Sequence, residues 1–160
     1  MGIVNKLMEQ ARKPTGWLGR LFLRDFNRHH SKLTDWGLKH VPIEQGDTIL
    51  DVGCGGGLTV HKLATIATNG KVYGVDFSEE SVAYSQRTNQ HWIEMGRVEI
   101  RQASVSQLPF PDTMFNLVTA VETTIFWPDL VTDMREVLRV LNEVRWEVHL
   151  HARGLQKRRG

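Results

Sequence analysis

A run of glycines directly after a short apolar segment is the feature that most constrains the fold of this chain. Residues 48–52 read TILDV, and their apolar and β-branched side chains favour a buried β-strand. Glycines follow at positions 53, 55, 56 and 57, and residues 58–68 then repeat apolar side chains at helical spacing. A strand, a glycine loop and a helix in this order predict the first unit of an α/β sheet. The missing Cβ atoms let a ligand approach the loop backbone.

The alternation of strands and helices continues along the chain. Near-continuous apolar strands predict a parallel sheet covered on both faces, so the fold class is α/β, doubly wound. The further strands are expected at 71–76, 98–100 and 115–121; the helices are expected from Ser78 to near Gly96 and from Pro128-Asp129 to Leu141. Ligands of such sheets bind beyond the carboxyl ends of the strands.

Asp76 ends the second predicted strand, where a carboxylate can accept two hydrogen bonds from a ribose diol. The dinucleotide fingerprint G-x-G-x-x-G is not met, because Leu58 and Val60 stand where its last glycine would be. No Gly-Lys-Ser/Thr sequence follows, which excludes a phosphate-binding P-loop. Asp51, expected at the mouth of the loop, would repel phosphate and attract an ammonium group. A nucleoside ligand that carries an amine is therefore favoured over a dinucleotide.

Composition narrows the class of protein. A single cysteine excludes an intramolecular disulfide, and no apolar run is long enough to span a membrane. The first residues lack the pattern of a signal peptide, so we expect a cytoplasmic protein. Both ends are basic and residues 41–150 are acidic, but the basic ends carry no recognised nucleic-acid-binding motif. Solvated surface is favoured there, with no nucleic-acid partner and no metal site predicted.

Four segments together carry a family resemblance: ILDVGCGGG at 49–57, VYGVDFS at 72–78, LPFPDTMFNLV at 108–118 and EVLRVL at 136–141. In order and spacing the sequence resembles the class I S-adenosylmethionine-dependent methyltransferases, in particular the ubiquinone/menaquinone type. The resemblance implies a Rossmann-like fold. It also implies transfer of a methyl group from S-adenosylmethionine to a small-molecule acceptor.

The resemblance also implies the cofactor contacts. Asp76 is expected to hold the ribose hydroxyls and Phe77 to pack on the adenine. Many members have an acid that bonds the adenine amine at the place of Ser104, and a backbone contact at Ser104 or Val105 can still serve here. The remaining expected cofactor residues belong to the loop: Asp51, Gly53, Cys54, Gly55 and Gly57. Of these, Asp51, Gly53 and Gly55 are expected to line the methionine part of the cofactor.

The sulfonium is already an activated methyl donor, so catalysis can consist of aligning the acceptor and excluding water. No catalytic residue is assigned; Glu122, just after the fourth strand, is a candidate for contact with the methionine end or the acceptor. A solvated carboxylate at the rim is an equal alternative for Glu122. For Trp127 packing is favoured over a wall of the acceptor pocket, and Cys54 is expected to be a small loop residue rather than a reactive thiol.

The family pattern stops after Leu141. In place of a Lys-Pro-Gly-Gly type turn the chain reads NEVRWEVHLHARGLQKRRG, which predicts an edge strand or a disordered tail and a methyltransferase shortened at its C-terminus. We divide the chain into an N-terminal helical cap at 1–45, a cofactor domain at 46–141 and a basic tail at 142–160. An exposed sheet edge predicts a homodimer. The alternatives are a cofactor-binding protein without turnover and, less favoured, a dinucleotide-dependent oxidoreductase.

Overall fold

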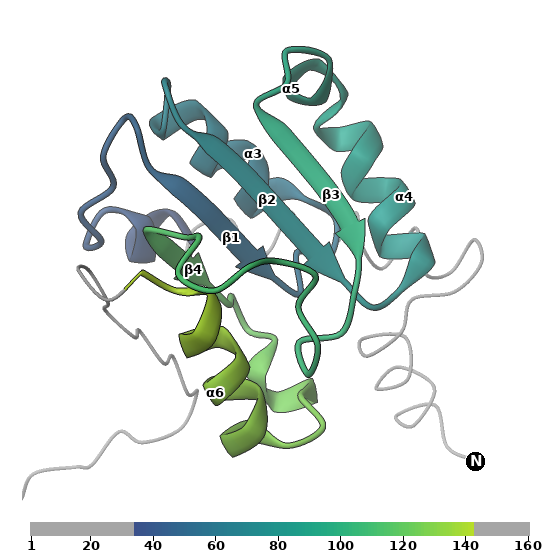
Figure 1. Ribbon diagram of the computed structural model, residues 1–160. Coiled ribbons are helices and arrows are strands. Elements are labelled where there is room, and N and C mark those ends of the chain that lie inside the picture. The colour runs from purple at the N-terminus through teal and green to yellow at the C-terminus, as the bar shows by residue number, and fades with distance from the viewer. Residues whose placement is uncertain (1–33, 143–160) are drawn as a thin grey trace, which may run out of the picture.

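The computed structural model describes residues 34–142, in which a four-stranded parallel sheet forms the centre (Figure 1). Residues 34–38 are helical and precede the first strand. The elements that follow are, in order, β1 (Thr48–Val52), α3 (Leu58–Ile66), β2 (Lys71–Asp76), α4 (Glu79–Thr88), α5 (Gln90–Glu94), β3 (Val98–Gln102), β4 (Leu117–Thr119), the 3-10 helix η1 (Thr124–Phe126) and α6 (Leu130–Val140).

The strand order in the sheet is β3-β2-β1-β4, with every neighbouring pair parallel. The chain therefore moves from β1 outward to β3 and then returns to the other side of β1 to form β4. This reversal places the topological switch point between β1 and β4. Crevices for ligands in open α/β sheets lie beyond the carboxyl ends of the strands at that point.

Side chains alternate between the two faces of the sheet, and each face has its own apolar cluster. Ile49 and Val72 lie with Leu63 of α3 in the first cluster, which also takes in side chains of α4 and α5. Leu50 and Val75 lie in the second, which α6 and the loop before β4 complete. The helices α3, α4 and α5 pack on one face of the sheet and α6 packs on the other (Figure 1), so the doubly wound α/β fold predicted from the sequence is confirmed.

Three predicted elements differ from the structure. The third strand, predicted at 98–100, extends to Gln102. The helix expected to run from Ser78 to near Gly96 is broken into α4 and α5 at Asn89, whose side-chain Nδ2 donates to the carbonyl oxygens of Ser85 and Gly57 at 3.0 Å each. The fourth strand is shorter than the predicted 115–121 and ends at Thr119. It ends there because the chain turns over β1, where the Thr123 hydroxyl donates to the Val52 carbonyl at 3.0 Å.

The loop at 108–112 is held against α6 by Arg139. Its guanidinium donates to the carbonyl oxygens of Leu108 and Phe110 at 3.1 and 2.9 Å and forms ion pairs with Glu136 and Asp112. The bonds to Glu136 and Asp112 raise the pKa of Arg139, and the Arg139 bond lowers the pKa of Glu136. Two segments of the family pattern, LPFPD and EVLRVL, thus meet through one arginine.

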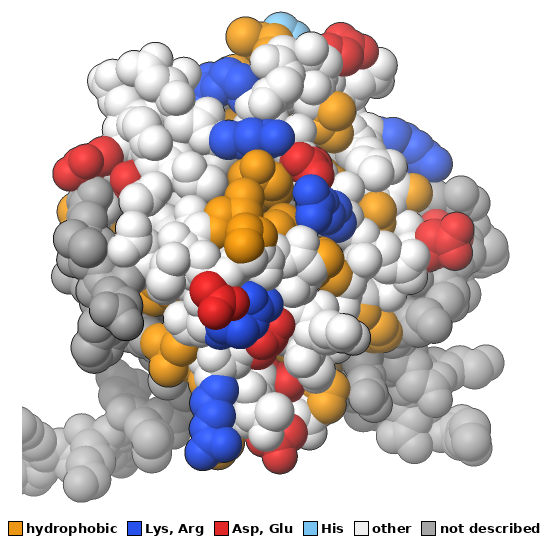
Figure 2. Space-filling view, in the orientation of Figure 1, with side chains coloured by type: hydrophobic (Ala, Val, Ile, Leu, Met, Phe, Trp, Pro, Cys, Tyr) orange, Lys and Arg blue, Asp and Glu red, His pale blue; other side chains and the backbone are white. Residues whose placement is uncertain are grey.

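The front face of Figure 2 shows an apolar area with basic side chains beside it. On the side of the sheet that faces the loop at 108–112, Lys71 Nζ lies 4.8 Å from the centre of the Tyr73 ring. The Arg101 guanidinium lies 4.9 Å from the centre of the Phe110 ring. Glu99 forms ion pairs with both cations, which lowers its pKa. The positive charges on this face are therefore partly neutralised.

Beyond α6 the chain returns to the sheet, where Leu141 and Phe115 form a parallel bridge and the Asn142 amide donates to the Phe115 carbonyl at 2.7 Å. Most of the predicted cap at 1–45 and of the tail at 142–160 lies outside the described residues. Within residues 34–142, no helix has the length and apolar character needed to cross a membrane.

Candidate cofactor site

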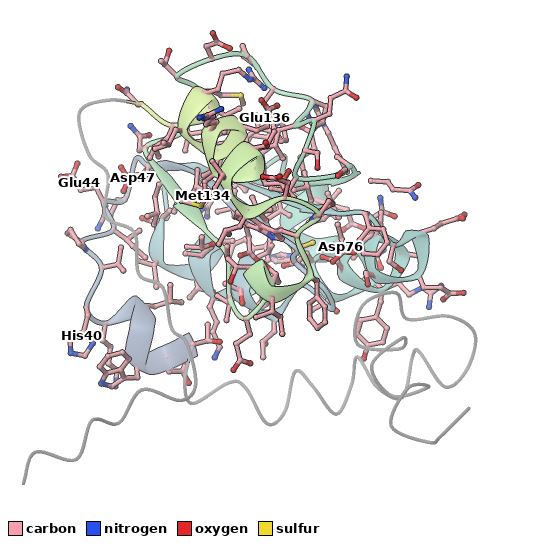
Figure 3. All side chains as sticks on the ribbon, turned by 90° about the horizontal axis from the view of Figure 1, so that it is seen from below. His40, Glu44, Asp47, Asp76, Met134 and Glu136 are labelled. Carbon is pink, nitrogen blue, oxygen red and sulfur yellow. The ribbon has the colours of Figure 1, made fainter. Side chains whose placement is uncertain are left out.

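The glycine loop passes over the carboxyl end of β2 as soon as it leaves β1. The amides of Gly53 and Cys54 both donate to the Val75 carbonyl, at 2.8 and 2.9 Å, and the Gly57 amide closes a turn on the Cys54 carbonyl at 2.8 Å. In Figure 1 the arrowheads of β1, β2 and β3 point downward, so Figure 3 looks onto this end of the sheet from below. The loop is therefore placed at the ligand-binding end of the fold.

Asp76 connects the loop to the turn between β2 and α4. Its carboxylate accepts hydrogen bonds from the Gly55 amide at Oδ2 and from the Ser78 amide at Oδ1, both at 2.9 Å, and the residue is 9% exposed. Burial raises the pKa of Asp76, and the two backbone hydrogen bonds oppose that rise. The Ser81 side chain also bonds to this carboxylate. A carboxylate has about four lone-pair sites, so Asp76 can still accept a hydroxyl group of a ligand.

Asp51 lies deeper than the sequence suggested. We expected an anion at the mouth of the loop, but Asp51 is only 2% exposed, between Gly74 of β2 and Thr119 of β4 in the sheet register. Burial raises its pKa to about 7, the hydrogen bond from Thr119 Oγ1 at 2.7 Å opposes that rise, and the charge of Asp76 adds to it. Near neutral pH, Asp51 is therefore a mixture of acid and carboxylate.

Gly53 and Gly57 adopt positive φ angles of 72° and 79°, a region that favours glycine. A Cβ atom at Gly53 would lie 2.6 Å from Thr123 Cγ2, and one at Gly57 would lie 2.3 Å from Ser85 Oγ. Both glycines are therefore required by contacts within the protein. From the sequence we expected the absent side chains to allow the approach of a ligand; at these two positions, packing within the protein is a sufficient cause.

The Cys54 side chain points away from the ligand side of the loop. It is 7% exposed and belongs to the apolar cluster with α3, and its Sγ lies 3.8 Å from the Ser85 hydroxyl. Burial, followed by the charges of Asp76 and Asp51, raises the pKa of the thiol well above its ordinary value. A protonated, buried thiol is not a nucleophile, which fits the expected small loop residue.

Phe77 follows Asp76 directly and is 41% exposed. Its carbonyl accepts a hydrogen bond from Gln102 Nε2 at 3.0 Å, which ties the turn after β2 to the end of β3. Ser104 and Val105 follow β3 at the same end of the sheet; Ser104 is exposed and Val105 is buried in the second apolar cluster. The aromatic ring and the loop after β3 are thus available on the same side of Asp76.

Glu122 and Trp127 follow β4. Glu122 has a positive φ of 55° and is partly exposed, with its Oε2 atom buried. Trp127 is partly buried and packs on the second apolar cluster, as the favoured packing interpretation predicted. The main chain beyond β4 thus passes over the end of β1 and next to the loop.

Three residues that fix this geometry were not singled out from the sequence. Thr119 holds Asp51, Thr123 holds the chain after β4 over the end of β1, and Asn89 holds the loop carbonyl of Gly57 from α4. The two threonines had a signal, since polar residues at the end of an apolar strand often face a site. Asn89 had none, because its partner lies far away in the sequence.

The comparisons with known proteins agree with this geometry. A methyltransferase-domain family profile matches residues 50–143, which include every element from the glycine loop to α6. The chain belongs to the class I S-adenosylmethionine-dependent methyltransferases. A fibrillarin family profile also matches, over residues 7–92, a span that includes the loop and the turn after β2 but ends before β3.

Two curated relatives of this methyltransferase chain are similar over about seven-tenths of its length. The 27-O-demethylrifamycin SV methyltransferase of Amycolatopsis mediterranei is 34% identical over 69% of the chain and 40% of its own length. The demethylmenaquinone methyltransferase of Oceanobacillus iheyensis is 29% identical over 72% of the chain and 48% of its own length. The chain thus spans less than half the length of these two relatives.

Solved structures share the fold. A S-adenosylmethionine-dependent methyltransferase from Aquifex aeolicus superposes with a TM-score of 0.67 and 23% identity, over 75% of this chain and 65% of that one. These matches give no support to the oxidoreductase alternative. The resemblance drawn from the four sequence segments is therefore confirmed at the level of family and fold.

Proposed function

We propose that this chain binds S-adenosylmethionine at the glycine loop and transfers its methyl group to a small-molecule acceptor. One observation carries the proposal: two buried carboxylates, Asp51 and Asp76, lie at the carboxyl ends of the neighbouring strands β1 and β2, beside a loop whose Gly55 amide is bonded to Asp76. Two acids at this place favour a ligand with hydroxyl groups and a cationic group.

The residues present fit that cofactor. Asp76 would accept the ribose hydroxyls, and ionised Asp51 would face the ammonium of the methionine part, beside the backbone of Gly53 and Gly55. The exposed Phe77 ring would pack on the adenine, whose amine would meet the backbone of Ser104 or Val105. We propose that residues 46–141 form the domain that holds the cofactor, with residues 1–45 as a cap and 142–160 as a tail.

The cofactor supplies an activated methyl group, so the protein has little covalent chemistry to perform. Its task is to hold the acceptor atom in line with the methyl group and to keep water away. Glu122 is the candidate for contact with the methionine end or with the acceptor, because its carboxylate is partly buried beside the end of β4. No general base is required where the acceptor atom is unprotonated at the working pH.

A small molecule is the acceptor we propose, because the two relatives above are named for a rifamycin and a menaquinone precursor. The described residues 122–134, which follow β4, contain no lysine or arginine that would attract a nucleic-acid backbone. The cytoplasmic location and the homodimer stay predictions, and a mass measurement across concentrations tests the second.

Calorimetric titration with S-adenosylhomocysteine tests the cofactor site in the wild-type chain and in an Asp76→Asn variant. Hydrogen bonds to a charged group contribute about 1.5–3 kcal/mol, so we expect affinity to fall by about one to two orders of magnitude in the variant. The matched control is Asp47→Asn, because Asp47 is also buried but lies before β1, at the opposite end of the sheet (Figure 3). It should change stability without changing affinity.

A folded wild-type chain that does not bind the ligand would refute the proposal, as would equal loss of affinity in the two variants. Transfer of labelled methyl from S-adenosylmethionine to candidate acceptors then tests turnover. Binding without transfer to any acceptor tried would favour the alternative of a cofactor-binding protein.

A further inference from the structure

Asp133, on the first turn of α6, is a buried carboxylate that the proposed function does not use. It is 1% exposed, and its two oxygens bind to different parts of the chain. Oδ1 accepts a hydrogen bond from the Ser106 hydroxyl at 2.7 Å, and Oδ2 accepts one from the Asp129 amide at 3.1 Å. Figure 3 labels its neighbour Met134 and also Asp76, in the view from below.

The Ser106 bond leads to the adenine side of the site. Ser106 follows Ser104 and Val105, the residues proposed to meet the adenine, and its amide donates to the Ser104 hydroxyl oxygen at 3.2 Å. The conformation of this short loop is thus fixed at Ser106 by its own hydrogen bond and by Asp133. Val105, in between, is buried in the second apolar cluster.

The hydrogen bond from the Asp129 amide connects Asp133 to the segment between β4 and α6. Asp129 is the N-cap of α6, where its own carboxylate accepts from the Thr132 amide at 2.8 Å, and it follows Trp127 and Pro128 directly. Trp127 packs on the same apolar cluster as Val105. The segment 125–130 therefore lies between the end of β4 and α6, where an acceptor would approach the methyl group.

A helix cap alone does not account for Asp133. Bonding to the Asp129 amide needs one oxygen, and a buried carboxylate is costly unless its remaining lone pairs are also satisfied. The Ser106 hydroxyl supplies that second partner. Ser106 lies in the loop after β3, and β4 separates this loop from α6 in the sequence. The carboxylate thus joins the loop after β3 to the segment that begins α6.

We propose that Asp133 is a positioning residue that couples the adenine-binding loop at 104–107 to the acceptor-side segment at 125–130. Ordering one loop then orders the other, so that binding of the nucleoside part of the cofactor shapes the place where the acceptor arrives. The inference rests on the proposed function, because it takes residues 104–105 as the adenine contact.

Hydrogen–deuterium exchange with 5′-methylthioadenosine tests the coupling. This ligand has the adenine and ribose but lacks the amino-acid part, so its expected contacts do not include 125–130. In the wild-type chain we expect it to slow exchange at 104–107 and also at 125–130. A double variant, Ser106→Ala with Asp133→Ala, should keep the slowing at 104–107 and lose most of it at 125–130.

The double variant removes both ends of the Ser106–Asp133 bond, because Ser106→Ala alone would leave the buried Asp133 oxygen without that hydrogen bond. Ser106→Thr is the conservative control, since it keeps the hydroxyl and should restore slowing at both segments. A melting curve checks that each variant is folded. If the double variant does not fold, Ser106→Ala alone takes its place in the comparison.

The outcomes separate the two proposals. Absence of binding to the folded wild-type chain would overturn both the proposed function and the coupling. Binding that leaves 125–130 unchanged in the wild type, or that slows 125–130 equally in the variant lacking the hydroxyl, would overturn the coupling alone. A merely structural role for Asp133 would change the melting temperature without separating the two segments.

Discussion

The raised pKa of Asp51 predicts that cofactor affinity depends on pH. Burial raises this pKa to about 7, and the ammonium of the cofactor would bind the ionised form. With a pKa of about 7, roughly a tenth of the free protein is ionised at pH 6 and roughly nine-tenths at pH 8. Affinity for S-adenosylhomocysteine should therefore rise about tenfold between pH 6 and pH 8, which corresponds to about 1.4 kcal/mol.

The stability of the fold depends on pH with the opposite sign to the affinity. Because the pKa of Asp51 in the folded chain is above its unfolded value, the folded state binds more protons between these values. Ionising Asp51 therefore reduces stability as pH rises toward 7 and through it, while the same ionisation improves binding. A bound cation would offset part of the cost of burying the charge.

Titration calorimetry from pH 6 to pH 8 measures this dependence. S-adenosylhomocysteine should gain affinity over the range, whereas 5′-methylthioadenosine, which has no ammonium, should bind with little change. In Asp51→Asn, the pH dependence of the first ligand should disappear, which separates Asp51 from the histidines of the chain. A flat profile in the wild type, or an equal slope in Asp51→Asn, would refute the assignment of Asp51 to the ammonium.

Two further predictions concern stability. Gly57→Ala should lower the free energy of unfolding by about 2–5 kcal/mol, because it adds left-handed strain and places a Cβ atom against Ser85. Gly46→Ala, where a Cβ atom meets nothing within 4 Å, should change it by no more than about 0.5 kcal/mol in the same urea titration. Arg139→Lys should cost about 1–2 kcal/mol, because an ammonium cannot reproduce bonds to two carboxylates and two loop carbonyls. A melt of Arg135→Lys, at an exposed position of the same helix, should match the wild type, and an equal loss there would contradict this account.

The elements that follow from local chemistry were predictable. Ser78 begins α4 as expected, with its hydroxyl accepting from the Ser81 amide at 3.4 Å and acids in the first turn. Asp129 likewise caps α6. β1 and β2 match their predicted ranges because both are short apolar segments that end at a turn signal. In each case the deciding residues are neighbours in the sequence.

The features that depend on distant contacts were not predictable. The break at Asn89 follows from its bond to Gly57, and the early end of β4 follows from the bond of Thr123 to Val52. The depth of Asp51 likewise depends on the strands on both sides of it. A single sequence does not show which of its residues form these pairs.

Contacts within the protein hold the glycine loop in place. Gly53 and Gly57 are fixed by Thr123 and by α4, and the Gly55 amide is bonded to Asp76. Binding would then cost little conformational entropy in the loop, which favours affinity. It also follows that Asp76 has two tasks, since the carboxylate proposed to hold the ribose also holds the loop. Loss of binding in Asp76→Asn therefore reports both tasks together, and an unchanged 5′-methylthioadenosine affinity in Asp51→Asn would show that the loop is intact in that variant.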